Sequence, residues 1–240
     1  MIKIEHTEVM GWEAAIRGMR NPMNSWDRSD SYTTYIEDPE TLETANYQFF
    51  VGDNDKDLML RLAKGGAVHA KYRRMIVVTC DITAPLYWWK EFDTYKVGTV
   101  ANSCSTMHKI HSKEFTLEDF SHEHLCNPDD PEDVCFSVYC TNSNSDDYLE
   151  DYFDDERVLD LVIKALNHYR DLYLKTKDKR YWYKMIQLLP TSYNQKRTVL
   201  LNYEVLAGIY PMRKDHKLDE WHTFCDWIRN LPHSDVIIGG

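Results

Sequence analysis

Glycine is scarce in this sequence, and the glycine-rich motifs of two large nucleotide-binding classes are missing. Only nine glycines occur among 240 residues. No segment reads G-x-G-x-x-G, the turn that holds a dinucleotide pyrophosphate, and none reads G-x-x-x-x-G-K-[ST], the phosphate loop of many nucleoside triphosphatases. Rossmann-type and P-loop chemistry are therefore disfavoured. Any cofactor must be bound by side chains and helix ends.

Long apolar runs and cysteine pairs are also missing. No hydrophobic stretch approaches the roughly 20 residues that a helix needs to cross a bilayer, so we expect no membrane span and no membrane partner. The first residues, MIKIEHTEVMGW, are acidic and polar where a secretory signal would be basic and then apolar. The six cysteines form no C-x-x-C pair and are expected to be free thiols. We therefore expect a cytoplasmic protein.

Positive charge is absent from one long stretch of the chain. Residues 114–156 contain fifteen Asp and Glu but no Lys or Arg, and the formal net charge of the whole chain is −11. The other residues hold 24 acids and 28 bases. The acidic stretch would repel a nucleic-acid backbone, whereas the mildly basic remainder suits small anionic ligands. We interpret the stretch as a solvated insertion and expect no nucleic-acid partner.

Before the acidic insertion, the hydrophobic pattern predicts both helices and strands. A helix is predicted over 11–19, stopped by the Asn-Pro at 21–22, and a second over 53–66, ended by two glycines. The β-branched run 74–80 (RMIVVTC) is predicted as a buried strand. Thr-Ala-Pro at 83–85 is expected to open another helix, which carries LYWWKEFDTYK.

After the start of the insertion, one strand and several helices are predicted. The strand is 134–139 (VCFSVY), between turn-rich segments. Apolar residues at helical spacing indicate helices over 156–174 and 218–231, and a proline interrupts the helical segment 181–190. Residues 198–210 are predicted as a strongly apolar helix that Pro211 ends, so the region after the insertion is predicted to be entirely helical.

A histidine-rich segment offers an apparent metal site. MHKIH and SHEHLC together hold four histidines and one cysteine, namely His108, His111, His122, His124 and Cys126. Zinc needs four ligands that converge tetrahedrally, and this spacing matches no common zinc signature. Ordinary surface histidines explain the pattern better, so we assign no metal ligand and keep a metal-dependent hydrolase as a remote alternative. Cys104, within NSCST, is interpreted as a packing residue rather than a nucleophile.

The segment HAKYRRMIVVTCDITAPLYWWKEF resembles the flavin-dependent thymidylate synthases, the ThyX type. In that family a Gly-His turn leads into a strand, and an Ala-Pro opens the helix that carries Arg-Gln-Trp and Arg-His-Arg. Here Ala84-Pro85 stands at the matching distance. The family signature Ser-x-Asn-Glu-x-Ser-x-Arg-Tyr is similar to VANSCSTMH, which keeps Asn102 and Ser105.

A second match lies far away along the chain. The family has a Leu-Pro, an Asn twelve residues later and an Arg eleven residues beyond that, which correspond to Leu189-Pro190, Asn202 and Arg213 without a gap. The early segment GWEAAIRGMRNP also looks like the family's Ala-Ala-Arg helix. The resemblance implies a single α+β domain over 1–240, in which a mixed sheet is packed by helices, with the acidic insertion at about 114–156 and a helical C-terminal region. It also implies a homotetramer with active sites between subunits.

The resemblance implies roles for seven residues. His69 and Asn202 would contact the flavin, and Lys96, the cation kept at the position of the Arg-His-Arg triplet, would bind the same cofactor. Arg213 would bind and polarise the uracil ring, so it is the predicted catalytic residue. The predicted nucleotide-binding residues, besides Arg213, occupy the positions of the family's glutamine, signature glutamate and second serine: Glu91, Ser103 and Ser105.

Several arginines of the family pattern are replaced in this sequence. The Arg-His-Arg triplet falls on Thr94-Tyr95-Lys96, the final Arg of the signature on Met107, and the Arg before Leu-Pro on Ile186. Arginine binds phosphate through a planar bidentate fork, which neither Met nor Ile can provide. Either other residues have rebuilt the nucleotide site, or the ligand has changed.

The function implied by the resemblance is a flavin-dependent transfer to C5 of a pyrimidine deoxynucleotide, dUMP or dCMP. FAD would supply the redox step, with NADPH and methylenetetrahydrofolate as cosubstrates. The loss of the arginine triplet keeps open an alternative, a protein of the same fold that binds nucleotide or flavin without this catalysis.

Overall fold

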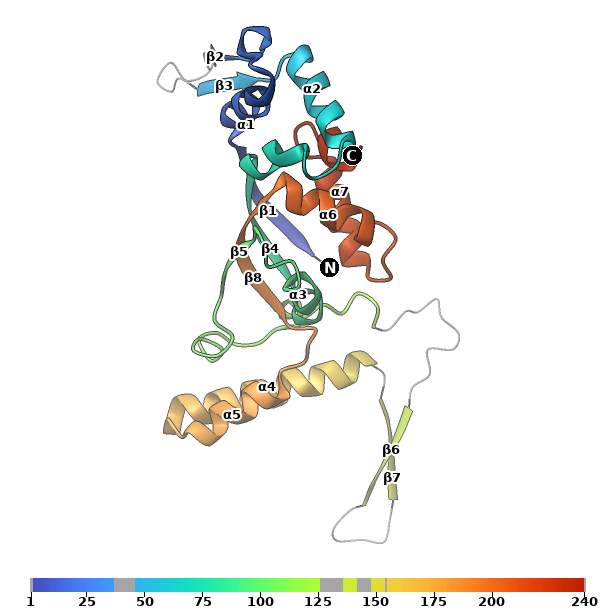
Figure 1. Cartoon of the computed structure of the whole chain (residues 1–240). Helices are drawn as coiled ribbons and strands as arrows, with labels where there is room; N and C mark the ends of the chain where they lie inside the picture. The colour runs from blue at the N-terminus through green and yellow to red at the C-terminus, as the bar shows by residue number, and fades with distance from the viewer. Residues whose placement is uncertain (1, 37–45, 126–135, 142–147, 154, 240) are drawn as a thin grey trace. The chain divides into compact units, whose positions relative to one another are not determined.

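The computed structural model describes residues 2–36, 46–125, 136–141, 148–153 and 155–239 (Figure 1). Its contacts divide the chain into two compact units. Unit 1 comprises Thr83–Glu91 and Ser103–Lys196, and unit 2 comprises Ile2–Ile82, Phe92–Asn102 and Arg197–Gly240. The single domain over 1–240 stays a prediction.

The main sheet has four strands in the order β1-β4-β8-β5. They are β1 (Lys3–Met10), β4 (Val77–Pro85), β8 (Asn194–Asn202) and β5 (Val100–Ser103). Every second residue of β4 is fully buried, as the β-branched run predicts, because successive side chains of a strand point to opposite faces. Two further pairs are antiparallel: β2 (Tyr32–Ile36) with β3 (Asn46–Phe50), and β6 (Phe136–Thr141) with β7 (Tyr148–Phe153).

The helices of unit 2 pack against one another and against one of its 3-10 helices, η3. They are α1 (Trp12–Arg20), α2 (Asp53–Lys64), α6 (Tyr203–Arg213), α7 (Asp219–Arg229) and α8 (Asp235–Ile238), with 3-10 helices η1 (Asn21–Met23), η2 (Trp26–Arg28) and η3 (Ala70–Met75). The sequence predictions for α1, α2 and α7 are confirmed to within a few residues. The α1 start needs a glycine, because Gly11 has φ +94° and a Cβ there would lie 2.1 Å from the Met75 carbonyl oxygen.

The prediction of a helix over 198–210 is wrong, and so is that of an entirely helical region after the insertion. Residues up to Asn202 belong to strand β8, and α6 begins only at Tyr203. Val199 and Leu201 are buried while Leu200 is exposed, which is the alternation of a strand. A short apolar run does not distinguish a buried strand from a helix. Moreover, Pro211 lies inside α6, which continues to Arg213.

The boundaries predicted around β4 also need correction. Residues 74 and 75 belong to η3 rather than to the strand, and Thr83, Ala84 and Pro85 extend β4 instead of opening a helix. Helix α3 (Leu86–Phe92) follows directly but ends before the Thr94-Tyr95-Lys96 segment. Trp88 and Trp89 of α3 are both buried, so neither is available to stack on a cofactor.

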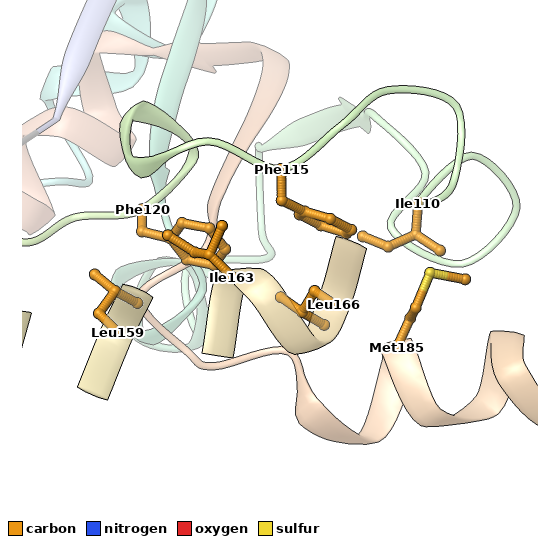
Figure 2. Close-up of a cluster of buried hydrophobic side chains, with 7 residues drawn as sticks. All are labelled: Ile110, Phe115, Phe120, Leu159, Ile163, Leu166 and Met185. Carbon is orange, nitrogen blue, oxygen red and sulfur yellow. The ribbon is translucent and has the colours of Figure 1, made fainter. Parts of the chain in front are cut away.

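Unit 1 is built around two helices that lie side by side, α4 (Asp155–Thr176) and α5 (Lys179–Leu188) (Figure 1). Figure 2 shows a cluster of buried hydrophobic side chains from α4, from α5 and from the segments before and after η4 (Leu117–Asp119). Its members are Ile110, Phe115, Phe120, Leu159, Ile163, Leu166 and Met185. The strand predicted at 134–139 is confirmed over residues 136–139 as part of β6, while residues 134 and 135 lie outside the described ranges. No helix in the described ranges is both long and apolar enough to span a membrane.

A buried ion pair joins α1 to α2 within unit 2. Arg20 Nε donates to Asp55 Oδ1 at 2.5 Å, and the Asp55 side chain has no exposed surface. The hydroxyls of Ser29 and Ser31 donate to Oδ2 at 2.6 and 2.7 Å. Burial alone would raise the pKa of Asp55, but the hydrogen bonds from Ser29, Ser31 and Arg20 and the charge of Arg20 outweigh it and hold this pKa below its usual value.

Replacing Asp55 is expected to destabilise unit 2 strongly. Asp55→Asn leaves the Arg20 charge buried without its partner, which costs about 3–5 kcal/mol of unfolding free energy. Urea unfolding followed by circular dichroism measures this loss. The matched control is Asp57→Asn on the same helix, which removes the exposed pair with Arg61 (2.9 Å) and should cost at most about 1 kcal/mol.

The same pair predicts an acid dependence of stability. The folded-state pKa of Asp55 lies below the unfolded value of about 3.9. Its contribution is therefore present above about pH 4 and is lost as the pH falls through the lower folded-state value. The difference in stability between the wild type and Asp55→Asn should shrink below pH 4. A difference that stays constant down to pH 2 would contradict the assignment.

Candidate functional site

Arg213, the last residue of α6, is held in a fixed orientation by two aromatic rings of unit 2. Its Nε donates a hydrogen bond of 2.7 Å to the hydroxyl of Tyr95. Its Cζ lies 4.5 Å from the centroid of the Trp221 ring and 5.5 Å from that of Tyr95. Trp221 is fully buried on α7 and therefore rigid. Cation–π contacts of this kind fix a guanidinium plane and keep its charge.

Asn202 lies at the junction between β8 and α6, next to the loop that carries Tyr95 and Lys96. Its Oδ1 accepts a hydrogen bond of 3.0 Å from the backbone N–H of Val205, so it is the N-cap of α6. Gly98 has φ +80°, and a Cβ there would lie 3.0 Å from Asn202 Nδ2. The loop after α3 therefore approaches the start of α6 as closely as only glycine permits.

Three of the predicted positions lie on α6 and on the loop beside it in unit 2, and no cavity in the described part of the chain is lined by more than one of them. Asn202 begins α6 and Arg213 ends it, while the loop of Lys96 contacts Asn202 through Gly98 and Arg213 through Tyr95. Lys96 itself is exposed. We call Tyr95, Lys96, Asn202, Arg213 and Trp221 the arginine cluster.

His69 lies on a neighbouring element rather than in the arginine cluster itself. It is exposed and immediately precedes η3. Helix η3 packs against α6, and the carbonyl of Ile76 after it accepts a hydrogen bond of 3.0 Å from the backbone N–H of Tyr203. Within the described part of the chain, no hydrogen bond joins His69 to Asn202 or Arg213.

Sequence reasoning missed Arg73, a buried cation of η3. Its side chain is about 5% exposed, and Nη1 lies 3.8 Å from Glu204 Oε2 on α6. That distance makes an ion pair without a good hydrogen bond. Among the described residues, Nε and Nη2 have no hydrogen-bond partner. Orphaned buried donors of this kind need an acceptor, such as a bound water or a ligand oxygen. The doubled arginine in KYRRM was the only signal in the sequence.

Unit 1 contains a separate cavity that includes one of the predicted nucleotide-binding residues. Ser105 lines it, and its Oγ accepts a hydrogen bond of 2.9 Å from the backbone N–H of His108. The cavity has a volume of about 410 Å³, within the range of small-ligand sites. Ser103, exposed at the end of β5, and Glu91, half-buried on α3, are not among the residues that line it.

The lining of this cavity includes cationic, acidic and aromatic side chains. Lys109, Lys113 and Lys196 line it together with Tyr193 and Phe115. Burial, and then the negative charges of Asp119 and Cys104, raise the pKa of the Tyr193 hydroxyl, which therefore remains a proton donor. Sequence reasoning missed the three lysines, because Lys196 is distant in sequence from Lys109 and Lys113 and none of them belongs to a recognisable motif.

A larger cavity in unit 2 contains none of the predicted residues. Its volume is about 750 Å³, and it lies beside the start of α1 and strand β3. Trp12 and His233 form part of its lining, and their rings meet edge to face at 5.1 Å. No local pattern in the sequence indicates it, since its walls come from four separate segments of the chain.

The histidines of the apparent metal motif make local contacts. His122 Nδ1 lies 2.9 Å from the Phe120 carbonyl, and the His111 ring packs on Tyr173. Across the described ranges, no three His, Cys, Asp or Glu side chains are close enough to hold a metal ion. Cys126 lies outside the described residues. Cys104 is exposed, whereas Cys80 and Cys225 are buried.

Similarity to known proteins is found in structure but not in sequence. No protein-family profile matches the chain, and no curated protein matches it. Thymidylate synthase X from Helicobacter pylori, solved with FAD and dUMP, aligns over 98% of this chain and 96% of its own, with a TM-score of 0.61 and 16% identity. Another complex of the H. pylori enzyme with FAD and dUMP gives 0.60.

A related methylase has the same architecture. The UMP/dUMP methylase PolB from Streptomyces cacaoi, bound with 5-Br dUMP, aligns over 99% of this chain and 94% of its own, with a TM-score of 0.54 and 13% identity. The resemblance in sequence motifs and the similarity in structure indicate the same architecture. The chain has the fold of the flavin-dependent thymidylate synthases.

Proposed function

We propose that this protein is a flavin-dependent transferase that modifies C5 of a pyrimidine deoxynucleotide, dUMP or dCMP. The observation that carries the proposal is Arg213, which Tyr95 and Trp221 orient at the end of α6 in a ThyX-like fold. Two structures of similar fold contain FAD and dUMP, and a third is a UMP/dUMP methylase. These ligands support the same substrate class here.

Arg213 is the proposed catalytic residue. C5 of a uracil ring becomes nucleophilic when negative charge on the ring is stabilised, and a preorganised guanidinium supplies that stabilisation without reorganising during the reaction. The cation–π contacts with Trp221 and the hydrogen bond to Tyr95 hold the Arg213 side chain in place before substrate binds. Such preorganisation is the physical basis of the proposed rate enhancement.

His69, Lys96 and Asn202 are the residues proposed to hold FAD. They offer an imidazole, an ammonium and an amide, which suit the carbonyl oxygens and phosphates of a flavin nucleotide. Buried Arg73 lies on η3, which packs against α6, and its Nε and Nη2 are donors without a hydrogen-bond partner among the described residues. A ligand oxygen could accept from them. When bound, the flavin would accept hydride from NADPH and reduce the one-carbon unit donated by methylenetetrahydrofolate.

One observation favours a second candidate, a nucleotide- or flavin-binding protein without this catalysis. Tyr95 stands at the middle of the segment that replaces the arginine triplet, and its hydroxyl accepts the Nε hydrogen of Arg213 itself. Tyr95 falls on the histidine of the triplet, and Thr94, which falls on its first arginine, adds no positive charge for a phosphate. Only Lys96 keeps a cation at the two arginine positions.

We also propose that the protein works as a homotetramer in the cytoplasm. Strand β5 is at the outer edge of the sheet order, and all four of its residues are exposed. Val97 is 91% exposed and Val100 is 65% exposed. An unpaired edge with exposed valines is an unstable surface for a monomer, and a second copy of the chain would cover it.

Flavin binding and turnover test the proposed function directly. The purified protein should be yellow or should bind added FAD, and NADPH oxidation followed at 340 nm should be stimulated by dUMP or dCMP in the presence of methylenetetrahydrofolate. Arg213→Gln should lower kcat by roughly 100-fold or more, the usual loss when a preorganised donor is removed. Arg229→Gln, a matched change on α7, should have little effect.

The three outcomes are distinct. A colourless protein that binds no FAD contradicts the proposed function. FAD binding without stimulated NADPH oxidation supports the binding protein instead. Turnover that survives Arg213→Gln unchanged removes Arg213 from its proposed role while leaving the reaction in place.

The hydrogen bond from Arg213 to Tyr95 can be tested separately. Tyr95→Phe keeps the ring but removes the acceptor, so the guanidinium loses part of its orientation, and kcat/KM for the nucleotide should fall about tenfold. Tyr210→Phe is the matched control, because Arg229 Nε donates to Tyr210 at 2.9 Å on the same helix α6. Equal losses in the two variants would argue for a general stability effect.

The tetramer is tested by light scattering coupled to gel filtration. Val97→Asp and Val100→Asp should each lower the measured mass toward that of a single 28.4 kDa chain, because a charge on a covered edge is costly to bury. Met23→Asp, at another exposed apolar position (51%), serves as the control. A monomeric wild type would rule out the homotetramer.

A further inference from the structure

The cavity of about 750 Å³ in unit 2 is lined by none of the residues predicted to bind flavin or nucleotide. Its volume lies within the range of small-ligand sites. Trp12 at the start of α1, His233 before α8 and Phe49 of β3 contribute aromatic side chains to its lining. We propose that this cavity binds an uncharged heteroaromatic ligand with two fused rings, such as a purine. The inference does not rest on the proposed function.

Two rings of the lining are held in place by packing. Trp12 meets the ring of His233 edge to face at 5.1 Å and the ring of Tyr203 at 5.3 Å. Tyr203 is fully buried on α6, and its hydroxyl donates a hydrogen bond of 2.5 Å to the carbonyl of Pro232. His233 has φ +50°, a left-handed conformation in which histidine is enriched. The indole and the imidazole are therefore oriented before a ligand arrives, which lowers the entropic cost of binding.

Both rings carry hydrogen-bonding groups that the protein itself does not use. In the part of the chain that the structure describes, no hydrogen bond involves the indole N–H of Trp12 or a ring nitrogen of His233. Burial, and then the charge of Lys56, lower the pKa of His233, while the charge of Asp235 acts in the opposite direction. The imidazole is therefore neutral above its usual pKa of about 6.5. One of its nitrogens then donates and the other accepts.

These groups complement a ring that has acceptors beside a donor on its edge. The edge of adenine has this pattern, with a ring-nitrogen acceptor next to an amino donor, and its faces can pack on Phe49 or Trp12. Thr33 and Gln48 add a hydroxyl and an amide to the lining, from β2 and β3. A ring without acceptors would leave donors of the cavity unpaired, so it should bind more weakly.

The charged side chains of the lining cancel. Glu13 and Arg17 are the only formally charged residues in it, and they lie one turn apart on α1 with Arg17 Nη1 3.8 Å from Glu13 Oε1. With a neutral His233, the lining has no formal net charge. A phosphate group therefore meets no surplus of cations in this cavity. We expect an uncharged ligand to bind at least as tightly as its phosphorylated form.

Calorimetric titration of the full chain at pH 7.5 tests the inference, with adenine, adenosine, AMP and indole as probes. His233→Gly removes the imidazole, and the matched control is His6→Gly, at an exposed histidine with φ +52° outside the cavity. Glycine adopts the left-handed conformation freely, so neither change strains the backbone. His233→Gly should lower adenosine affinity about tenfold, as the loss of two hydrogen bonds implies. The control should bind adenosine as the wild type does.

A second variant fills the cavity and leaves its polar groups in place. Ala14 is half-buried on α1 and belongs to the lining. Ala14→Trp should place a large ring in the ligand's position and lower adenosine affinity at least as much as His233→Gly does. Circular dichroism verifies that both variants keep the wild-type helix content.

The choice of probe and the salt concentration give further readouts. Indole has a fused ring pair and a donor but no ring-nitrogen acceptor, so it should bind the wild type about tenfold more weakly than adenine. AMP should bind no more tightly than adenosine. The adenosine affinity should stay constant when salt is raised, because screening acts on charge contacts and the cavity makes none with this ligand.

The inference is overturned if the wild type binds neither adenine nor adenosine with a Kd of about 1 mM or tighter. It is also overturned if the folded variants bind adenosine like the wild type, if indole binds as tightly as adenine, or if AMP binds more tightly than adenosine. The variants leave His69, Asn202 and Arg213 unchanged, so FAD uptake should match the wild type. An equal loss of FAD and adenosine would assign adenosine to the flavin site and end the inference. Adenosine binding in a protein that takes up no FAD would sustain it while ending the proposed function.

Discussion

The junction between β8 and α6 is the contact on which the candidate site depends. At this point Asn202 caps the helix, and the next residue, Tyr203, donates its backbone N–H to the carbonyl of Ile76. Gly98 comes close to the Asn202 amide because it carries no side chain. One short stretch of backbone thereby sets the direction of α6 and the path of the loop after α3. The geometry around Arg213 follows from both.

The loss of arginines and the arrangement around Arg213 have a common physical logic. A guanidinium needs an acceptor or an aromatic face when it is partly buried. With tyrosine at the centre of the former triplet, Arg213 has both on one side, from Tyr95 and Trp221. Tyr95, which falls on the histidine of the triplet, thus orients Arg213, while Thr94, which falls on the first arginine, offers no charge to a phosphate.

Much of this arrangement could be predicted from spacing, and the failures have identifiable causes. The spacing of Pro190, Asn202 and Arg213 was informative because it can be compared with the family pattern without assigning the secondary structure between these residues. The strand within that interval was missed, since a short apolar run such as TVLLN is compatible with either a strand or a helix. Arg73 and the three lysines were missed for another reason, because burial and proximity of distant residues arise from tertiary packing and leave no local pattern.

The Arg20–Asp55 pair has a consequence for how the chain can be shortened. Asp55 has no exposed surface and accepts hydrogen bonds from Ser29 and Ser31, which follow η2, and from Arg20 at the end of α1. A fragment that starts after these donors would carry a lone carboxylate into an apolar interior, where it must take up a proton or open the packing around α2. Residues 20–31 are therefore integral to unit 2, and any trimmed version of the protein must retain them.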